Sequence, residues 1–152
     1  MKIAVATDHA GYPLKEVIVE TIRTLGHTPI DLGTGSTESV DYPDFAEKAG
    51  MAIVNGDADR AIGICGSGVG VCIAGNKIPG VYACLCHDTY SAAQGVEHDQ
   101  MNMLCLGARV IGSELAIRVV ACFIAAQPSD DPRHIRRTSK IKEIEEKWLR
   151  DA

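Results

Sequence analysis

The hydrophobic positions of the chain form short apolar runs that are separated by longer stretches with helical spacing. The runs at residues 2–7, 28–32, 61–65, 81–86 and 102–106 are rich in apolar or β-branched residues, which predicts five strands. Several of these runs are apolar throughout, as is typical of strands covered on both faces. The pattern therefore indicates a sheet in the middle of the molecule.

The stretches between the runs predict helices. The clearest covers residues 13–26, where Pro13 suits a first turn and Gly26 can end the helix. Further helices are expected over residues 44–54, 69–77, 89–95 and 113–126, and a polar one over about 133–150. Strands alternating with helices predict the α/β class, with one Rossmann-like domain, a mainly parallel five-stranded sheet and helices on both faces.

The last part of the chain differs in composition from the rest. Residues 129–132 carry a turn signal, and the polar helix follows. No linker or repeat divides residues 1–152, so we expect a single domain, with an α/β core at 1–127 and a helical tail at 128–152. The tail helix has a narrow apolar stripe formed by Ile135, Ile141, Ile144 and Trp148. A stripe of this kind favours packing on a partner subunit.

Composition excludes several classes of protein. With 152 residues, 46% hydrophobic and 23% charged, the chain can bury a core of normal size for one domain. Its longest apolar run, residues 119–126, is far shorter than the roughly 20 residues of a membrane-spanning helix. The N-terminus lacks a secretory pattern, which predicts a cytoplasmic protein. A net charge of -5 argues against a nucleic-acid partner.

The cysteine pattern fits a reducing compartment. The six cysteines lie mostly in apolar runs, where a reduced thiol packs as a small hydrophobe. Cys84 and Cys86 precede His87, but no second ligand pair follows at the spacing of a zinc site. We therefore expect free thiols and no metal.

Polar residues gather next to the predicted strands. Ligands bind beyond the carboxyl ends of the strands in open α/β sheets, so these residues are candidates for a site. Asp8 and His9 follow the first strand, Tyr42 comes after the second, and Arg109 follows the fifth. His98 and Asp99 come just before the fifth strand, and we expect them at the same edge.

Three alternate glycines, Gly66, Gly68 and Gly70, follow the third predicted strand and lead into a helix. Their backbone amides can turn inward and hold an anion or oxyanion. Val71 stands where the dinucleotide fingerprint has its third glycine, and the P-loop and Cys-x5-Arg phosphatase patterns also fail. The spacing favours a small-molecule anion, and a dinucleotide site with Asp88 as its ribose contact is the alternative.

Cys65 lies at the mouth of this glycine loop. Backbone amides and a helix N-terminus stabilise a thiolate, so Cys65 could act as a base or a nucleophile. His9 and His98 could exchange protons near neutral pH, and the amides could hold an enediolate oxygen. The set favours abstraction of a proton next to a carbonyl. Acyl transfer through cysteine and histidine, or a cysteine that only packs, are the alternatives.

The tail helix begins with a basic cluster. It contains no acidic residue and consists of Arg133, Arg136, Arg137, Lys140 and Lys142. Arg133 and Arg137 are four residues apart and share a helix face, with His134 alongside, which suits a phosphate group. The alternative is a solvated basic face, balanced by the glutamates that follow.

Five ordered motifs resemble type B ribose-5-phosphate isomerase and its galactose-6-phosphate isomerase relatives. They are TDHAG at residues 7–11, SVDYPDF at 39–45, ICGSGVG at 64–70 with AGNK at 74–77, LGARVIG at 106–112, and the Arg133-His134 pair. The resemblance covers essentially the whole chain. It implies a Rossmann-like domain that forms homodimers or homotetramers with shared active sites and needs no metal or other cofactor.

The resemblance also implies roles for matching positions. Cys65 resembles the base that moves a proton between C1 and C2, and His98 resembles the acid that opens the furanose ring. The cradle for the enediolate is implied to be Ser67 with the amides of Gly66, Gly68, Val69 and Gly70. The implied sugar contacts are Asp8, His9, Tyr42, Asp99 and Asn102. The implied phosphate contacts, some of them from the partner subunit, are Arg109, Arg133, His134 and Arg137.

The implied function is an aldose–ketose isomerase that interconverts ribose 5-phosphate and ribulose 5-phosphate by ring opening and a cis-enediolate. One alternative is the same chemistry on galactose or allose 6-phosphate, because Asp99 and Tyr82 depart from the family pattern and leave the preferred sugar open. Another is a non-catalytic, flavodoxin-like protein that binds a phosphate-bearing ligand such as flavin mononucleotide. A third is a subunit that needs a paralogous partner.

Overall fold

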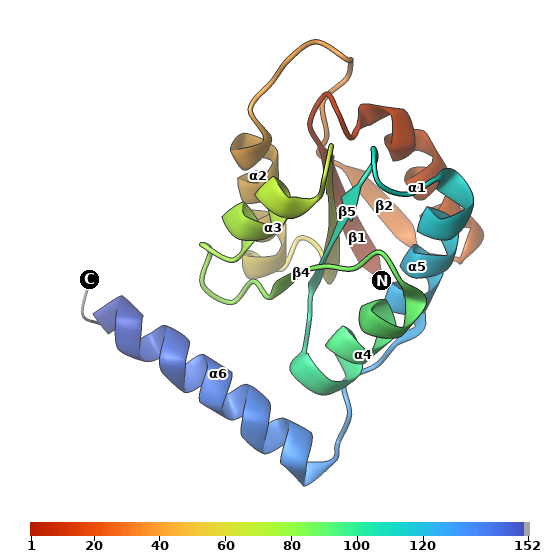
Figure 1. The fold of residues 1–152 in the computed structure, drawn as a ribbon. Coiled ribbons are helices and arrows are strands. Elements are labelled where there is room, and N and C mark those ends of the chain that lie inside the picture. The colour runs from red at the N-terminus through yellow and green to blue at the C-terminus, as the bar shows by residue number, and fades with distance from the viewer. Residues whose placement is uncertain (151–152) are drawn as a thin grey trace.

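Five parallel strands form the central sheet of the computed structural model, which describes residues 1–150 (Figure 1). They are β1 (Lys2–Thr7), β2 (Thr28–Asp31), β3 (Arg60–Cys65), β4 (Ala83–Leu85) and β5 (Met103–Gly107). Their order across the sheet is β2-β1-β3-β5-β4, and every neighbouring pair is parallel. The predicted parallel five-stranded sheet is confirmed.

Six helices surround the sheet. They are α1 (Tyr12–Thr24), α2 (Tyr42–Val54), α3 (Val69–Gly75), α4 (Thr89–Asp99), α5 (Ser113–Ala125) and α6 (Pro132–Arg150). The predicted helices are confirmed, and the largest difference is that α4 continues through Gly95 to Asp99. Met101 packs against Gly95, and the helix ends at Gln100, which adopts a left-handed φ of 57°.

Helices cover both faces of the sheet (Figure 1), and a hydrophobic core lies on each face. Side chains alternate along a strand, so Ile3 and Val5 enter the core beneath α1, α4 and α5, whereas Ala4 and Ala6 enter the core beneath α2 and α3. Burying a side chain of the size of isoleucine stabilises the fold by about 2 kcal/mol. The sheet is therefore held rigidly, and the loops at its edges have fixed supports.

The sheet register fixes which loops meet at the carboxyl edge. Thr7 at the end of β1 lies beside Ile64, and Cys65 at the end of β3 lies beside Gly107. The sheet grows outward from β1 and β3 in opposite directions, so the chain leaves a crevice between the carboxyl ends of these two strands. Ligands of doubly wound sheets bind in this crevice.

The last helix, α6, packs against α4, and its second half reaches the turn before β4 through the hydrogen bond from the Gly80 amide to Glu145. The helix lies apart from the sheet, at the edge of the molecule (Figure 1). Ile144 and Trp148 are 60% and 65% exposed. In the described part of the chain, every helix is too short or too polar to span a lipid bilayer.

Candidate active site

A pocket of about 420 Å³ opens at the crevice between β1 and β3. It is lined by Asp8, His9, Ala10, Tyr42, Cys65, Gly66, Ser67, Gly70, Arg109 and Val110. Eight of these ten residues were candidates from the sequence. Ala10 and Val110 were not, because an alanine and a valine beside a charged residue carry no chemical signal.

Cys65 is the one cysteine among the residues that line this pocket. Its side chain ends β3, the residue is 5% exposed, and its Sγ accepts a hydrogen bond from the Gly68 amide at 3.1 Å. This hydrogen bond holds the sulfur atom in place at the wall of the pocket. The arrangement can therefore present a base to a substrate in the pocket.

Gly68 makes this contact possible. Its φ of +80° lies in the left-handed region, and an added Cβ would sit 2.8 Å from the carbonyl carbon of Leu106. The loop thus folds closely over the end of β5 and turns the Gly68 amide toward Cys65. Only glycine fits both the dihedral angle and the space.

We expect Gly68→Ala to lower the melting temperature and to remove most catalytic turnover. The left-handed backbone alone costs an alanine about 1–2 kcal/mol, and the contact with Leu106 adds to it. Thermal unfolding and a turnover assay measure the two effects. Gly112→Ala is the matched control, because nothing lies within 4 Å of its added Cβ. Unchanged stability and turnover in Gly68→Ala would contradict this account of the loop.

The amides of the glycine loop are not all free. The Gly68 amide is bonded to Cys65, and the Val69 amide donates to Ser67 Oγ at 3.2 Å. Gly70 is the second residue of α3, so its amide has no partner within the helix. The cradle open to an anion is thus formed by the Gly70 amide and the exposed Ser67 side chain.

Asp8 and His9 are held by the backbone around them. Asp8 is 5% exposed, and its Oδ1 accepts a hydrogen bond from the Gly11 amide at 2.8 Å. His9 Nδ1 accepts from the Val40 amide at 3.2 Å, so the neutral ring carries its proton on Nε2. The contact from Val40 joins the long loop after β2 to the pocket, which the sequence did not reveal.

Tyr42 and Arg109 close two sides of the pocket. The Tyr42 ring lies over Gly70, since an added Cβ there would be 2.7 Å from ring carbon Cε2. The Arg109 amide donates to the Gly66 carbonyl at 3.0 Å, which ties the loop after β5 to the glycine loop. The pocket therefore combines a thiol, a carboxylate, an imidazole and a guanidinium.

Two residues that follow β4 have structural partners. His87 Nε2 accepts from the Gly107 amide at 2.9 Å, and the Asp88 carboxylate caps α4 by accepting from the Ser91 amide at 2.7 Å. The Ser91 amide holds the pKa of the Asp88 carboxyl below its ordinary value. The Asp88 carboxylate therefore serves as the N-cap of α4. This role argues against a dinucleotide site in which Asp88 would bind the ribose.

The prediction that His98 and Asp99 lie at this edge of the sheet is wrong. α4 starts at the carboxyl end of β4 and runs back, so its last turn lies at the amino edge (Figure 1). Asn102 precedes Met103, the first residue of β5, whereas Cys65 is level with Gly107 at the far end. A strand of five residues spans about 16 Å, so His98 and Cys65 of one chain are apart.

Asp99 and Asn102 share the amino edge with His98. Asp99 lines a separate cavity of about 320 Å³ together with Tyr82 and Ile141. Asn102 Oδ1 accepts from the Tyr82 amide and its Nδ2 donates to the Gly80 carbonyl, each at 2.8 Å. The side chain of Asn102 thus joins the starts of β4 and β5.

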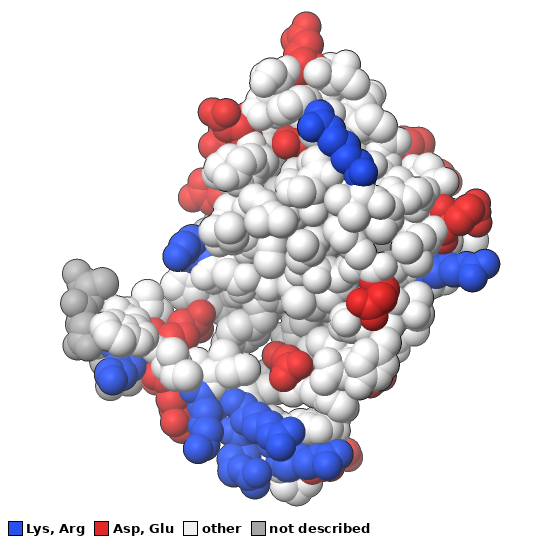
Figure 2. Space-filling model, viewed as in Figure 1, with Lys and Arg blue, Asp and Glu red and all other residues white. Residues whose placement is uncertain are grey.

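The basic residues of α6 also lie at the amino edge. Figure 2 shows Lys and Arg side chains gathered over the first part of this helix. Arg133 forms an ion pair with Asp131, at 3.1 Å between Nε and Oδ2, and its side chain is 60% exposed. His134 is buried against α4, where its ring stacks on His98 with the centroids 3.9 Å apart.

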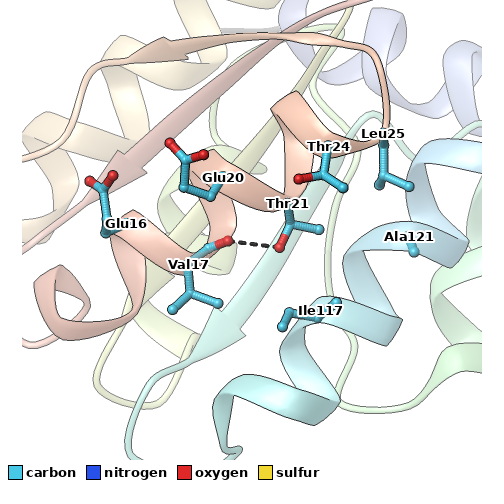
Figure 3. A pocket seen from close by; sticks show the side chains of 8 residues that line it. All are labelled: Glu16, Val17, Glu20, Thr21, Thr24, Leu25, Ile117 and Ala121. Atoms are coloured by element: carbon cyan, nitrogen blue, oxygen red, sulfur yellow. Dashed lines mark hydrogen bonds between the residues drawn. The ribbon is translucent and has the colours of Figure 1, made fainter.

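A larger cavity, of about 480 Å³, lies between α1 and α5 (Figure 3). Its walls are mostly aliphatic, and Thr21 Oγ1 donates to the Val17 carbonyl rather than into the cavity. Its lining includes two glutamates, Glu16 and Glu20, but no cysteine, histidine, lysine or arginine. In the described residues, no group of three or more His, Cys, Asp or Glu is placed to hold a metal ion.

The fold and the pocket define a class of protein: an open parallel α/β sheet with a thiol, a glycine-rich loop and a guanidinium at its carboxyl edge. Residues 3–141 match the model of the Ribose/Galactose Isomerase family. The chain is 41% identical over 146 residues to ribose-5-phosphate isomerase B of Escherichia coli (strain K12), covering 96% of this chain and 97% of that protein. The chain belongs to this family and is a sugar phosphate isomerase.

Two further comparisons agree. The structure of ribose-5-phosphate isomerase B from Clostridium thermocellum superposes with a TM-score of 0.93 at 44% identity, covering 97% of this chain and 99% of that one. D-erythrulose-4-phosphate isomerase of Pectobacterium atrosepticum is 38% identical over 128 residues, or 84% of each chain. Relatives with different sugar phosphates in their names thus have similar levels of identity to this chain.

Proposed function

We propose that the protein interconverts ribose 5-phosphate and ribulose 5-phosphate. The observation that carries this proposal is the hydrogen bond from the Gly68 amide to Cys65 Sγ, inside a pocket that also holds Asp8, His9 and Arg109. The similarity to ribose-5-phosphate isomerases from Escherichia coli and Clostridium thermocellum supports the choice of a five-carbon substrate.

The proton transfer follows from the pocket. The Cys65 thiolate takes the proton from C2 of the open-chain aldose, and the electrons move to the carbonyl oxygen to give a cis-enediolate. Ser67 and the Gly70 amide are placed to stabilise the oxygen that becomes negative. The proton of the C2 hydroxyl passes to the neighbouring oxygen on C1, and the Cys65 thiol returns its proton to C1, which leaves the ketose with its carbonyl at C2. Asp8 and His9 orient the sugar hydroxyls.

Ring opening needs an acid, and we assign this step to His98 of a second copy of the chain. His98 lies across the sheet from Cys65 in its own chain, so the two can act on one substrate only when two copies meet. A two-fold axis that places the amino edge of one copy on the carboxyl edge of the other creates two identical shared sites. The active form is therefore at least a homodimer.

The exposed face of α6 supports this arrangement. Arg133, Arg137, Ile144 and Trp148 are spaced by four, seven and four residues, which puts them on one side of the helix. Burial of Ile144 and Trp148 on the second copy would turn both arginines toward the pocket of that copy. They would join its Arg109 around the phosphate, with His134 beside them, and guanidinium pairs bind phosphate in two-pronged geometry.

The double variant Arg133→Ala, Arg137→Ala should raise KM for ribose 5-phosphate by at least about 100-fold, because each charged hydrogen bond contributes about 1.5–3 kcal/mol to binding and the variant removes two. We expect a small change in kcat, measured by steady-state kinetics. The double variant Arg136→Ala, Lys142→Ala removes equal charge from the same helix and serves as the control. An unchanged KM in the first variant would mean that Arg133 and Arg137 only form a solvated face and do not bind the phosphate.

The substrate choice is tested by comparing kcat/KM for four aldose phosphates. They are ribose 5-phosphate, galactose 6-phosphate, allose 6-phosphate and erythrose 4-phosphate, and the first should give the largest value. The name of the Pectobacterium relative is the reason to include the four-carbon sugar. A higher value for another of the four would move the assignment to that substrate.

The free cysteines of the described chain support a reducing, cytoplasmic setting.

A further inference from the structure

His98, at the amino edge of the sheet, is in contact with two side chains, Gln94 and His134. The proposed function gives Gln94 no role and places His134 near the phosphate. Gln94 and His98 lie one turn apart on α4, with Gln94 Nε2 2.9 Å from His98 Nδ1. His134 of α6 covers a face of the His98 ring, at an interplanar angle of 29°. In Figure 1, the end of α4 and the start of α6 lie close together at the lower side of the molecule.

The contact from Gln94 selects a tautomer. A side-chain amide nitrogen only donates hydrogen bonds, so His98 Nδ1 must be the acceptor. A neutral histidine has one ring proton, and that proton is then on Nε2. No hydrogen bond to His98 Nε2 is formed within the described residues, so its N–H remains available to a substrate.

The contact from His134 fixes the plane of the ring. His134 is 5% exposed, and its Nδ1 is buried without a hydrogen-bond partner. Burial lowers the pKa of His134, and the nearby His98, Arg133 and Arg137 lower it further. A neutral His134 stacks on His98 without charge repulsion, and rotation of the His98 ring would break both the stack and the bond to Gln94.

We propose that Gln94 is a positioning residue that holds His98 as the Nε2–H tautomer, with the His134 ring as its backing, so that Nε2 presents a proton to the ring oxygen of a sugar in the partner's pocket. The role of the proton rests on the proposed function, whereas the tautomer does not. After donation, Nε2 can take the proton of the sugar hydroxyl at C1, which restores the acid as the aldehyde forms.

Nuclear magnetic resonance on protein with isotope-labelled histidine tests the tautomer directly. Spectra are recorded at alkaline pH, where histidine is neutral, and the His98 signals are assigned by their loss in His98→Asn. We expect the wild-type His98 proton on Nε2. In Gln94→Glu the carboxylate can only accept, so the proton should move to Nδ1, and Gln94→Leu should give a mixture. A wild-type proton on Nδ1, or an unchanged tautomer in Gln94→Glu, would overturn the proposal.

Kinetics separate positioning from a structural role. Gln94→Glu should lower kcat for ribose 5-phosphate on the order of 100-fold, the lower limit of what a general acid contributes. Erythrose 4-phosphate cannot close a furanose ring, since its ring-forming oxygen carries the phosphate, so its turnover should fall much less. Gln127→Glu adds the same charge at an exposed glutamine and should match wild type. An equal loss on both substrates would overturn the link to ring opening. If wild type isomerises neither sugar, the proposed function fails while the spectra still decide the tautomer.

Discussion

Cys65→Ala is expected to lose isomerase turnover by at least about 100- to 10,000-fold, the range that proton transfer by a positioned side chain contributes. The variant removes the only thiol that lines the pocket and leaves Asp8, His9 and Arg109 in place. Phosphate binding should therefore persist. The loss of one small side chain at the end of β3 should leave the fold intact, because the hydrophobic cores on both faces of the sheet are otherwise unchanged.

Three measurements on Cys65→Ala check this result: turnover of ribose 5-phosphate, thermal unfolding, and binding of the substrate by calorimetry. Cys72→Ala is the matched control, since Cys72 lies on α3 outside the pocket and should retain turnover. Turnover near the wild-type level in a folded Cys65→Ala protein would remove Cys65 from the mechanism.

Two inactive variants are expected to restore activity when they are combined in one dimer. Cys65→Ala and His98→Asn each lack one half of every site. In a heterodimer, one of the two shared sites combines the Cys65 of one chain with the His98 of the other. A heterodimer purified through two different affinity tags should therefore turn over ribose 5-phosphate at about half the wild-type rate, because one site in two is complete.

The complementation experiment has internal controls. Each variant purified alone should remain inactive. A heterodimer of wild type with a chain that carries both substitutions should also be inactive, because each of its sites lacks either Cys65 or His98. An inactive heterodimer, with both parent homodimers folded, would contradict the shared site. His98 would then have to act within its own chain or not at all.

The sequence predicted the fold well, because parallel strands buried on both faces and amphipathic helices leave strong local patterns. The loop around Cys65 was also predictable, since a residue that directly follows a strand must lie at the carboxyl edge. The same rule holds for Asp8 and His9, which directly follow β1 (Lys2–Thr7) and line the pocket at the carboxyl edge.

The placement of His98 was predicted wrongly, although the same rule about strand ends decides it. A residue that directly precedes a parallel strand lies at the amino edge, so His98 and Asp99 belong to the opposite end of β5 from Arg109. Tertiary contacts were also beyond the sequence pattern. The bond from the Val40 amide to His9 and the packing of Tyr42 on Gly70 join segments that no local periodicity connects.

The most direct test of the isomerase assignment is incubation of the wild-type protein with ribose 5-phosphate in deuterated water, followed by proton nuclear magnetic resonance. The account predicts that ribulose 5-phosphate forms and that recovered ribose 5-phosphate carries deuterium at C2, because the proton held by Cys65 can exchange with solvent. Neither product nor exchange at C2 would contradict it.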